Sequence, residues 1–428
     1  MCVPREPREK EMRNKAITLM RVTYEKAEKV LVLDAGLEAT NHTDFDFLEI
    51  FARVICSGWT RRLWTLQEAF FAQSLWIQFR DEAINMVHMM KEHHELDRRI
   101  STRWLYAFLK TSYFGMRASQ AMDPPNPQFS IHSLAMTAPG RSTENYADEP
   151  TCLSTLLGLP LESLSSVPEE ERMLQFWRLL SESPTKIPDY IIFEHCPRLS
   201  QEGFRWAPSS ILISKILEVA ISSESRGVKI LSQSEVRSHG LNTDFPGIQL
   251  SPVIQVRKPT TLDRPYFMRI DDGKWYNLYL PQPLAEELPM DYSQYAIIFS
   301  RTPSSSESPG HALLVRIYET RGNAKFVNRI CPILVPPLVE KTDKNVAKIF
   351  KAIFQFVPKS GSEVEEEETF GEAGHEILRR DPSLHDCLPT TARSQHALAI
   401  TQLVHNFIGG RFVASGKRLP DTQQWCVD

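Results

Sequence analysis

The residue with the clearest chemical potential is Glu68, which lies in an aromatic stretch between residues 56 and 72. The apolar residues of this stretch recur at spacings of four, three and four, which predicts a helix with one buried stripe. They are Trp59, Leu63, Leu66 and Phe70. Glu68 is not on this stripe and shares a helix face with Trp64, with Arg61 one turn further back. The pattern therefore predicts a carboxylate beside an indole on a half-buried helix.

Two interpretations of Glu68 remain open from the sequence. As a functional residue, its carboxylate could stabilise or position a cationic, sugar-linked intermediate. As a structural residue, it could form an ion pair with Arg61 or Arg62 near the surface. The choice depends on whether the folded chain brings an arginine to the carboxylate.

Two other polar clusters are interpreted as structural. The cluster at residues 88–95 fits no standard pair of helical metal ligands with a third ligand, which indicates a solvated helix face. Its members are His88, Glu92, His93, His94 and Glu95. The Gly-Arg-Ser-Thr segment at residues 140–143 has one glycine and no preceding strand, which favours a plain loop over a phosphate-binding turn. The sequence also has no Gly-x-Gly-x-x-Gly motif, no His-Glu-x-x-His motif and no spacing that indicates a Ser-His-acid set.

Composition sets the outer limits. The chain has 428 residues, 42% of them hydrophobic and 10% aromatic, which is enough for more than one core. The net charge of -4 provides no global basic field, so neither nucleic acid nor a membrane is expected as a partner. The seven cysteines occur singly, and their odd number argues against a full disulfide framework, so the compartment is expected to be reducing. Because the chain lacks a long apolar run and a signal-peptide core, we expect a soluble cytoplasmic protein.

The first 82 residues have an α/β pattern. The predicted order is a helix at about 9–29, a strand at 30–33, a helix at 44–56, a helix at 59–72 and a strand at 74–79. The strand at 30–33 is entirely apolar, which is typical of a buried parallel strand, and it ends at Asp34. Ligands of such sheets gather beyond the carboxyl ends of the strands, which here means near Asp34 and the loop before Glu68.

A helical segment and a β-rich α+β region are predicted to follow. Helices are expected at 83–120, at 153–159 and after Pro168, where three acidic residues complement the helix dipole. Strands are expected at 190–193, 228–231, 275–280, 295–299, 312–318 and 330–335, with an exposed loop at 302–309. Beyond residue 340 we expect helices at 344–356 and 392–407, an acidic linker at 361–368 and an irregular ending. The predicted division is 1–82, 83–186, 187–340 and 341–428.

Several blocks resemble a known family. Residues 13–34 and 59–69 are similar to the second half of the fungal heterokaryon-incompatibility (HET) domain. Residues 141–149, 171–177 and 203–208 resemble segments that follow this domain in many large fungal HET proteins. The resemblance implies a cytosolic switch for programmed cell death after non-self recognition.

HET domains in turn resemble Toll/interleukin-receptor (TIR) domains, whose flavodoxin-like sheet places a Trp-x-x-x-Glu helix after a central strand. Some TIR proteins cleave NAD at the nicotinamide–ribose bond with that glutamate. Trp64-Thr65-Leu66-Gln67-Glu68 matches this spacing. The resemblance implies NAD as a substrate, with Glu68 catalytic and with Asp34, Arg61 and Trp64 binding the nucleotide. It implies no metal, and no further cofactor is assigned.

One departure from the family affects the expected activity. A complete HET domain begins with two strands and a helix, of which only residues 1–5 have a counterpart here, so the sequence predicts an N-terminally truncated domain with an exposed sheet edge. The sequence leaves open whether the protein is an enzyme. The alternatives are a non-catalytic module that associates with itself or with another incompatibility protein, through the sheet edge or residues 59–72, and an inactive truncated copy.

Overall fold

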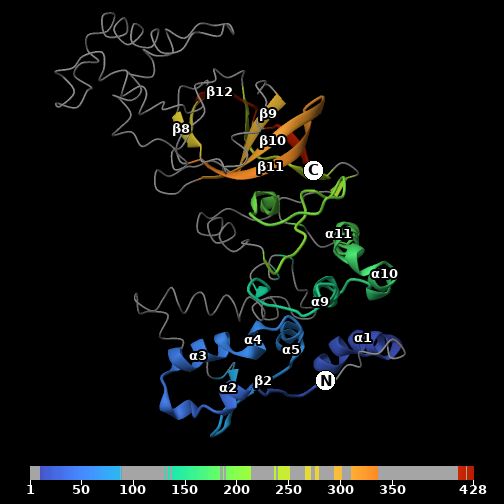
Figure 1. Cartoon of the computed structure of the whole chain (residues 1–428), viewed down its shortest axis with the longest axis vertical. Coiled ribbons are helices and arrows are strands. Elements are labelled where there is room, and N and C mark those ends of the chain that lie inside the picture. Colours follow the sequence, from blue (N-terminus) through green and yellow to red (C-terminus); the bar gives the residue numbers. More distant parts are fainter. Residues whose placement is uncertain are drawn as a thin grey trace, which may run out of the picture. The chain divides into compact units, whose positions relative to one another are not determined.

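A computed structural model provides the fold of the chain. It describes residues 10–86, 88, 131, 134, 137–183, 187, 189–213, 236–237, 240–250, 266–270, 275–278, 294–300, 310–335, 413–420 and 422–428. The described residues form a mixed α/β protein, as the sequence predicts. The chain divides into two compact units, Met1–Leu241 and Asn242–Asp428 (Figure 1). The finer four-part division stays a prediction.

A small mixed sheet lies in the first unit. Its strands are β1 (Val30–Val32), β2 (Leu75–Gln78) and β3 (Ala83–Asn85). β1 and β2 are parallel, whereas β2 and β3 are antiparallel neighbours. The two strands expected on either side of the residue 59–72 stretch are thus confirmed. The burial predicted for the strand at 30–33 is wrong, because only Val32 is buried whereas Leu31 and Leu33 are exposed at the sheet edge. The helix expected from residue 83 is wrong at its start, because residues 83–85 pair with β2, and residues 89–120 lie outside the described residues.

Short helices connect and cover these strands. They are α1 (Lys10–Lys26), α2 (Ala35–Glu38), the 3-10 turn η2 (His42–Asp44), α3 (Phe47–Cys56), α4 (Gly58–Arg61) and α5 (Thr65–Phe71). α1 and α3 confirm the helices predicted before and after β1. Asp46 begins α3 because its carboxylate accepts the Glu49 N–H at 2.9 Å. α5 packs against α1, which places this helix inside the unit.

The single helix expected over residues 59–72 is in fact two helices. Arg62 is extended, with φ -84° and ψ 139°, and forms a parallel bridge with Ser142. The Leu63 N–H donates to the Ser142 carbonyl at 2.9 Å, and the Ser142 N–H donates to the Arg61 carbonyl at 2.7 Å. These bonds to a distant segment replace helical bonds, so α4 ends there. The predicted apolar stripe is nevertheless buried at all four positions: Trp59, Leu63, Leu66 and Phe70.

A second group of helices follows in the first unit. It consists of α9 (Asp148–Leu157), α10 (Leu161–Ser165), the 3-10 turn η4 (Glu169–Glu171) and α11 (Arg172–Glu182). The helix start predicted at Pro168 is confirmed, because η4 leads directly into α11. α9 packs against both α5 and α11. α9 therefore connects the Glu68-bearing helix to the rest of the unit.

The segments at 171–177 and 203–208 form one core. The rings of Trp177 and Trp206 meet edge-on with 5.5 Å between their centroids, and both are fully buried. The Trp177 indole N–H donates to the Pro208 carbonyl at 2.9 Å. The Trp206 indole N–H donates to the Gly203 carbonyl at 3.0 Å, so both indoles combine a buried ring with a satisfied polar group.

The strand expected at residues 190–193 is wrong, because these residues lie in the 3-10 helix η5 (Asp189–Phe193). All four side chains of 190–193 are buried, so no alternation was present to distinguish the two structures. The Arg198 guanidinium donates to the carbonyls of Ile191 and Glu194 at 3.0 and 2.6 Å. A side chain thus satisfies carbonyls that a strand would pair within a sheet.

The remaining described strands form a ten-stranded sheet. Its order is β4-β5-β13-β11-β10-β9-β6-β12-β7-β8. The strands are β4 (Val236–Arg237), β5 (Gly240–Thr243), β6 (Gly247–Leu250), β7 (Tyr266–Ile270), β8 (Trp275–Leu278), β9 (Tyr295–Phe299), β10 (Gly310–Arg321), β11 (Ala324–Val335), β12 (Val413–Arg418) and β13 (Gln424–Val427). The strands predicted between residues 275 and 335 coincide with β8 to β11. The features predicted at 228–231, 302–309, 344–356, 361–368 and 392–407 lie outside the described residues.

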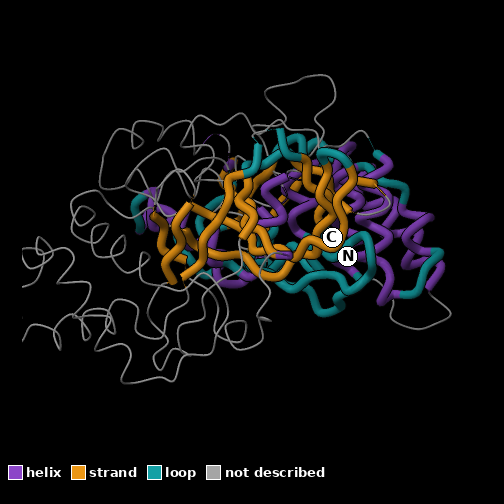
Figure 2. The backbone as a smooth tube through the Cα atoms, turned by 90° about the horizontal axis from the view of Figure 1, so that it is seen from above, coloured by secondary structure: helices purple, strands orange, loops and turns teal. Residues whose placement is uncertain are grey.

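The irregular ending predicted for the chain is wrong, because β12 and β13 lie there. β13 is parallel to β11, and Trp425 is fully buried. The Trp425 indole N–H donates to the Phe245 carbonyl at 2.8 Å. A Cβ on Gly247 in β6 would lie 2.2 Å from the Trp425 ring, although β6 and β13 are not neighbours in the sheet. The sheet therefore curves, which brings β6 close to the Trp425 indole of β13. The curvature of the strands can be followed in Figures 1 and 2.

Candidate functional site

Glu68 lies on α5 at a point where three helices meet. Its side chain is half-buried, and its Oε2 accepts the indole N–H of Trp59 from α4 at 2.9 Å. The phenol of Tyr24 from α1 interacts with the same carboxylate. The carboxylate is therefore oriented by two uncharged side chains from two other helices.

This arrangement raises the pKa of the Tyr24 phenol. Burial is the largest cause that raises the pKa of Tyr24, followed by the negative charge of Glu68 and a side-chain hydrogen bond with it. The positive charge of Arg62 lowers the pKa only in part. The phenol therefore remains protonated at neutral pH and can act as a donor.

The ion pair considered for Glu68 is not formed in the described part of the chain. Arg61 and Arg62 are both exposed, and neither forms an ion pair with Glu68 there. The exposed Arg62 lies near enough to Tyr24 to affect the pKa of its phenol, so there is positive charge close to the Tyr24–Glu68 contact. The negative charge of Glu68 is thus not neutralised by a described cation.

The indole bonded to Glu68 is not the one in the Trp-x-x-x-Glu motif. Trp64 instead donates its indole N–H to Asp148 Oδ2 on α9, at 3.1 Å. Trp59 precedes Glu68 by nine residues, which is not a helical contact spacing. The break at Arg62 brings the two residues together, and no local pattern in the sequence indicated it.

Asp34 and Arg61 were the other residues expected to bind a nucleotide. Asp34 follows β1, and its Oδ2 accepts the main-chain N–H of Trp59 at 3.0 Å. It is therefore connected to the site through Trp59. The Arg61 side chain is exposed, and its carbonyl holds Ser142. Of these two residues, Asp34 is the one whose side chain bonds to the surroundings of Glu68 within the described residues.

Arg141 is a contributor that sequence reasoning missed. This side chain is buried, and its Nη1 donates to the Arg62 carbonyl at 3.0 Å and to Thr65 Oγ1 at 3.2 Å. Burial lowers the pKa of Arg141 to about 10, so the guanidinium stays charged at neutral pH. It stabilises the break between α4 and α5 from the loop predicted at residues 140–143. An arginine between a glycine and two hydroxyl residues was the only sequence signal.

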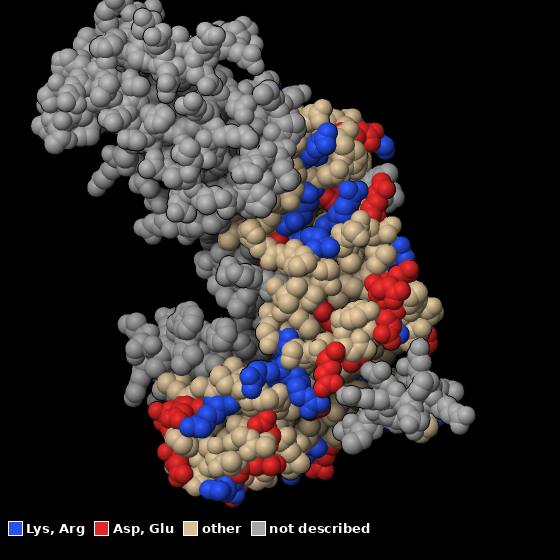
Figure 3. Space-filling view, viewed as in Figure 1, with Lys and Arg blue, Asp and Glu red and all other residues tan. Residues whose placement is uncertain are grey.

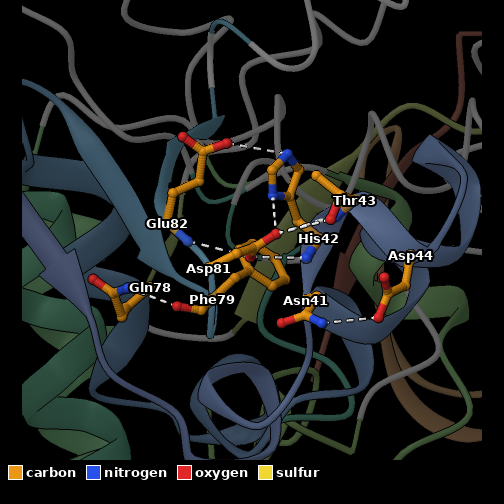
Figure 4. A network of polar contacts seen from close by, with 8 residues as sticks. All are labelled: Asn41, His42, Thr43, Asp44, Gln78, Phe79, Asp81 and Glu82. Carbon is orange, nitrogen blue, oxygen red and sulfur yellow. Dashed lines mark hydrogen bonds and ion pairs between the residues drawn. The ribbon is translucent and has the colours of Figure 1, made fainter.

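A second polar network lies at the carboxyl end of β2, in the turn that leads to β3 (Figure 4). His42 Nδ1 is 2.9 Å from Asp81 Oδ2, and His42 Nε2 is 3.2 Å from Glu82 Oε1. Asp81 also accepts the main-chain N–H groups of His42 and Thr43 at 3.0 and 3.3 Å. Both ring nitrogens face carboxylates, so the imidazole has no free nitrogen to act as a general base. The network joins η2 to the β2–β3 turn.

Other site classes find little support in the described residues. No group of three or more His, Cys, Asp or Glu side chains there is arranged to hold a metal ion. Among the described helices, none combines the length and the apolar character needed to cross a membrane. Basic and acidic side chains occur in small groups of both signs on the face shown in Figure 3.

The surroundings of Glu68 are thus the strongest candidate site. Comparisons with protein-family models, with curated proteins and with solved structures found no match to this chain.

Proposed function

We propose that the protein is a HET-type cell-death switch that cleaves the nicotinamide–ribose bond of NAD, with Glu68 as the acting carboxylate. The observation that carries the proposal is the state of Glu68. Its carboxylate is half-buried and oriented by Trp59 and Tyr24, without an ion pair in the described part of the chain. This is the functional alternative that the sequence left open.

The reaction explains why it matters that Glu68 has no ion pair in the described part of the chain. When the bond breaks, its electron pair leaves with the nicotinamide nitrogen, and positive charge develops on the ribose. A nearby carboxylate stabilises that charge, whereas an arginine paired to the carboxylate would oppose it. Water then forms the new bond to the ribose carbon and releases a proton. Uncharged donors such as the Trp59 indole orient Glu68 without neutralising it.

The local fold supports the same site. In a flavodoxin-like or TIR-like arrangement, ligands bind beyond the carboxyl ends of parallel strands. β1 and β2 are parallel, and Asp34, just after β1, bonds to Trp59. Glu68 is therefore linked to the end of β1 by a single residue. A TIR-like fold, a cytoplasmic location and a role in heterokaryon incompatibility belong to this proposal.

A second candidate function is a non-catalytic module that associates with itself or with another incompatibility protein. Its support is a set of exposed apolar side chains on α1, on β1 and directly after β1, which is an edge strand of the described sheet. They are Met12, Leu19, Val22, Leu31 and Leu33. Leu33 retains 65% of its accessible surface, which is unusual for a residue in an all-apolar run.

Release of free nicotinamide from NAD by the purified chain tests the enzyme proposal. We expect release by the wild type and a loss of about 100-fold or more in Glu68→Gln, which keeps the size of the side chain but not its charge. Glu49→Gln is the matched control, because Glu49 is a helical glutamate on α3 that pairs with Arg53. No release by the wild type, or equal release by Glu68→Gln, would reject the proposal.

The association candidate has a separate test. Sedimentation of the wild type over a range of concentrations measures self-association, and Leu33→Lys introduces a charge at the exposed sheet edge. We expect the variant to dissociate more readily if β1 forms the contact. A wild type that stays monomeric at every concentration excludes self-association.

A further inference from the structure

Asp34 joins two elements through main-chain bonds. Its Oδ1 accepts the N–H groups of Gly36 and Leu37 at 3.0 and 3.4 Å, which begins α2. Its Oδ2 accepts the Trp59 N–H, 25 residues later, at 3.0 Å. Both carboxylate oxygens are therefore engaged by the protein itself.

Two glycines enclose the Asp34 carboxylate. A Cβ on Gly36 would lie 3.3 Å from Oδ1, and a Cβ on Gly58 would lie 3.2 Å from Oδ2. Both distances are tighter than ordinary contacts of a Cβ, so the carboxylate occupies a slot that larger residues would narrow. The slot holds the carboxylate against the first turn of α4. Each oxygen of Asp34 thus already accepts from main-chain donors, Oδ1 from Gly36 and Leu37 and Oδ2 from Trp59.

We infer that Asp34 is a positioning residue for Glu68, rather than a ligand-binding residue. The connection runs through Trp59, whose main-chain N–H bonds to Asp34 and whose indole N–H bonds to Glu68. α4 has only four residues, so it is too short to fix the indole by its own hydrogen bonds. The inference rests on the proposed function in one respect, namely that Glu68 is the acting carboxylate.

The direct readout of this inference is spectroscopic and needs no activity. The full chain is labelled with 5-fluorotryptophan, and its ¹⁹F resonances are assigned with Trp59→Phe and Trp64→Phe. We expect Asp34→Asn to shift the Trp59 resonance while the Trp64 resonance, which reports the bond to Asp148, stays in place. Glu68→Gln should also shift the Trp59 resonance. Asp46→Asn is the matched control, because Asp46 caps α3 in the same way without contacting Trp59.

Kinetics provide the second readout. Asp34→Asn should lower kcat for NAD cleavage about tenfold or more and leave KM unchanged, because the carboxylate is displaced while substrate contacts persist. Trp59→Phe should have the same effect, and combining the two variants should add little, because both act through one bond. A raised KM with unchanged kcat would instead identify Asp34 as a ligand contact and overturn the inference.

The two proposals fail in different ways. If the wild type releases no nicotinamide, the enzyme proposal is rejected, while the fluorine spectra still decide the role of Asp34. If Asp34→Asn leaves the Trp59 resonance unmoved although Glu68→Gln shifts it, the positioning role is rejected whatever the activity.

Discussion

Glu68 and Glu149 are both helical glutamates of the first unit, but their surroundings differ. Glu149 on α9 is only 4% exposed and accepts hydrogen bonds from Ser210 Oγ at 2.8 Å and from the Ile211 N–H at 2.6 Å. Glu68 is half-buried and meets side chains from α1 and α4. The Glu149 carboxylate binds the segment at residues 210–211, whereas the Glu68 carboxylate keeps contact with solvent.

The difference lies in the type of donor. Main-chain N–H groups at residues 211 and 212 need an acceptor once they are buried, so Glu149 fulfils a structural requirement. The Trp59 indole and the Tyr24 phenol can exchange a protein acceptor for water at a half-buried site. We therefore expect stability to depend on Glu149 and chemistry to depend on Glu68.

The largest expected effect is that of Glu149→Ala. Removing this carboxylate leaves the part-buried hydroxyl of Ser210 and the buried N–H of Ile211 without this acceptor, and we expect the free energy of unfolding to fall by about 3 kcal/mol. Chemical denaturation measures the change. Glu162→Ala on α10, an exposed glutamate, is the control and should change stability by less than about 0.5 kcal/mol. Equal losses in the two variants would contradict the structural role of Glu149.

Tyr24→Phe tests how much the hydrogen bond to Glu68 contributes to stability. The variant removes one donor from a half-buried carboxylate that water can reach, so we expect a loss of about 1 kcal/mol or less in unfolding free energy. The same denaturation experiment measures it. A loss as large as that of Glu149→Ala would show that the contact among α1, α4 and α5 is a structural lock instead of an accessible site.

A pH titration separates Glu149 from an ordinary surface carboxyl. Burial is the main cause that raises the pKa of Glu149, and hydrogen bonds from Ser210 and the following N–H groups only partly offset it. The folded state therefore holds a proton that the unfolded state has released, so this group makes stability fall as pH rises above the ordinary glutamate pKa. Glu149→Gln should flatten that slope in thermal unfolding followed across pH. An unchanged slope would mean that Glu149 does not titrate differently in the folded state.

The smallest effect is expected in the network of Figure 4. Partial burial raises the pKa of Asp81, but hydrogen bonds from the His42 and Thr43 N–H groups and the Thr43 hydroxyl outweigh this and hold the pKa well below its ordinary value. Such a group stabilises the fold above its ordinary pKa and loses that contribution as pH falls through the folded value. The advantage of the wild type over Asp81→Asn in Tm should therefore shrink below about pH 4. A Tm difference between the wild type and Asp81→Asn that grows as pH falls would contradict the lowered pKa of Asp81.

Local patterns were sufficient for several elements. α1, β1, α3 and the start of α11 follow from apolar spacing and from residues such as Pro168 that begin helices. The break at Arg62 depends on Ser142, and the helical turn at 189–193 is supported by Arg198. Ser142 lies far from Arg62 in the sequence, so no window around Arg62 contains the information. Arg198 lies only seven residues after Ile191, but the all-apolar run at 190–193 gives no sign that its carbonyls bond to a side chain.

The sequence by itself determined that a carboxylate would lie among aromatic residues on a helix after an α/β start. The helix was predicted to be half-buried, but in α5 every residue except Glu68 is buried. Only the tertiary structure decided which aromatic residues those are. Glu68 bonds to Trp59 and meets Tyr24, while Trp64 bonds to Asp148 on another helix. The physical reason is that helical spacing predicts neighbours only while the helix continues, and bonds from residues 141 and 142 end α4 before Glu68 is reached.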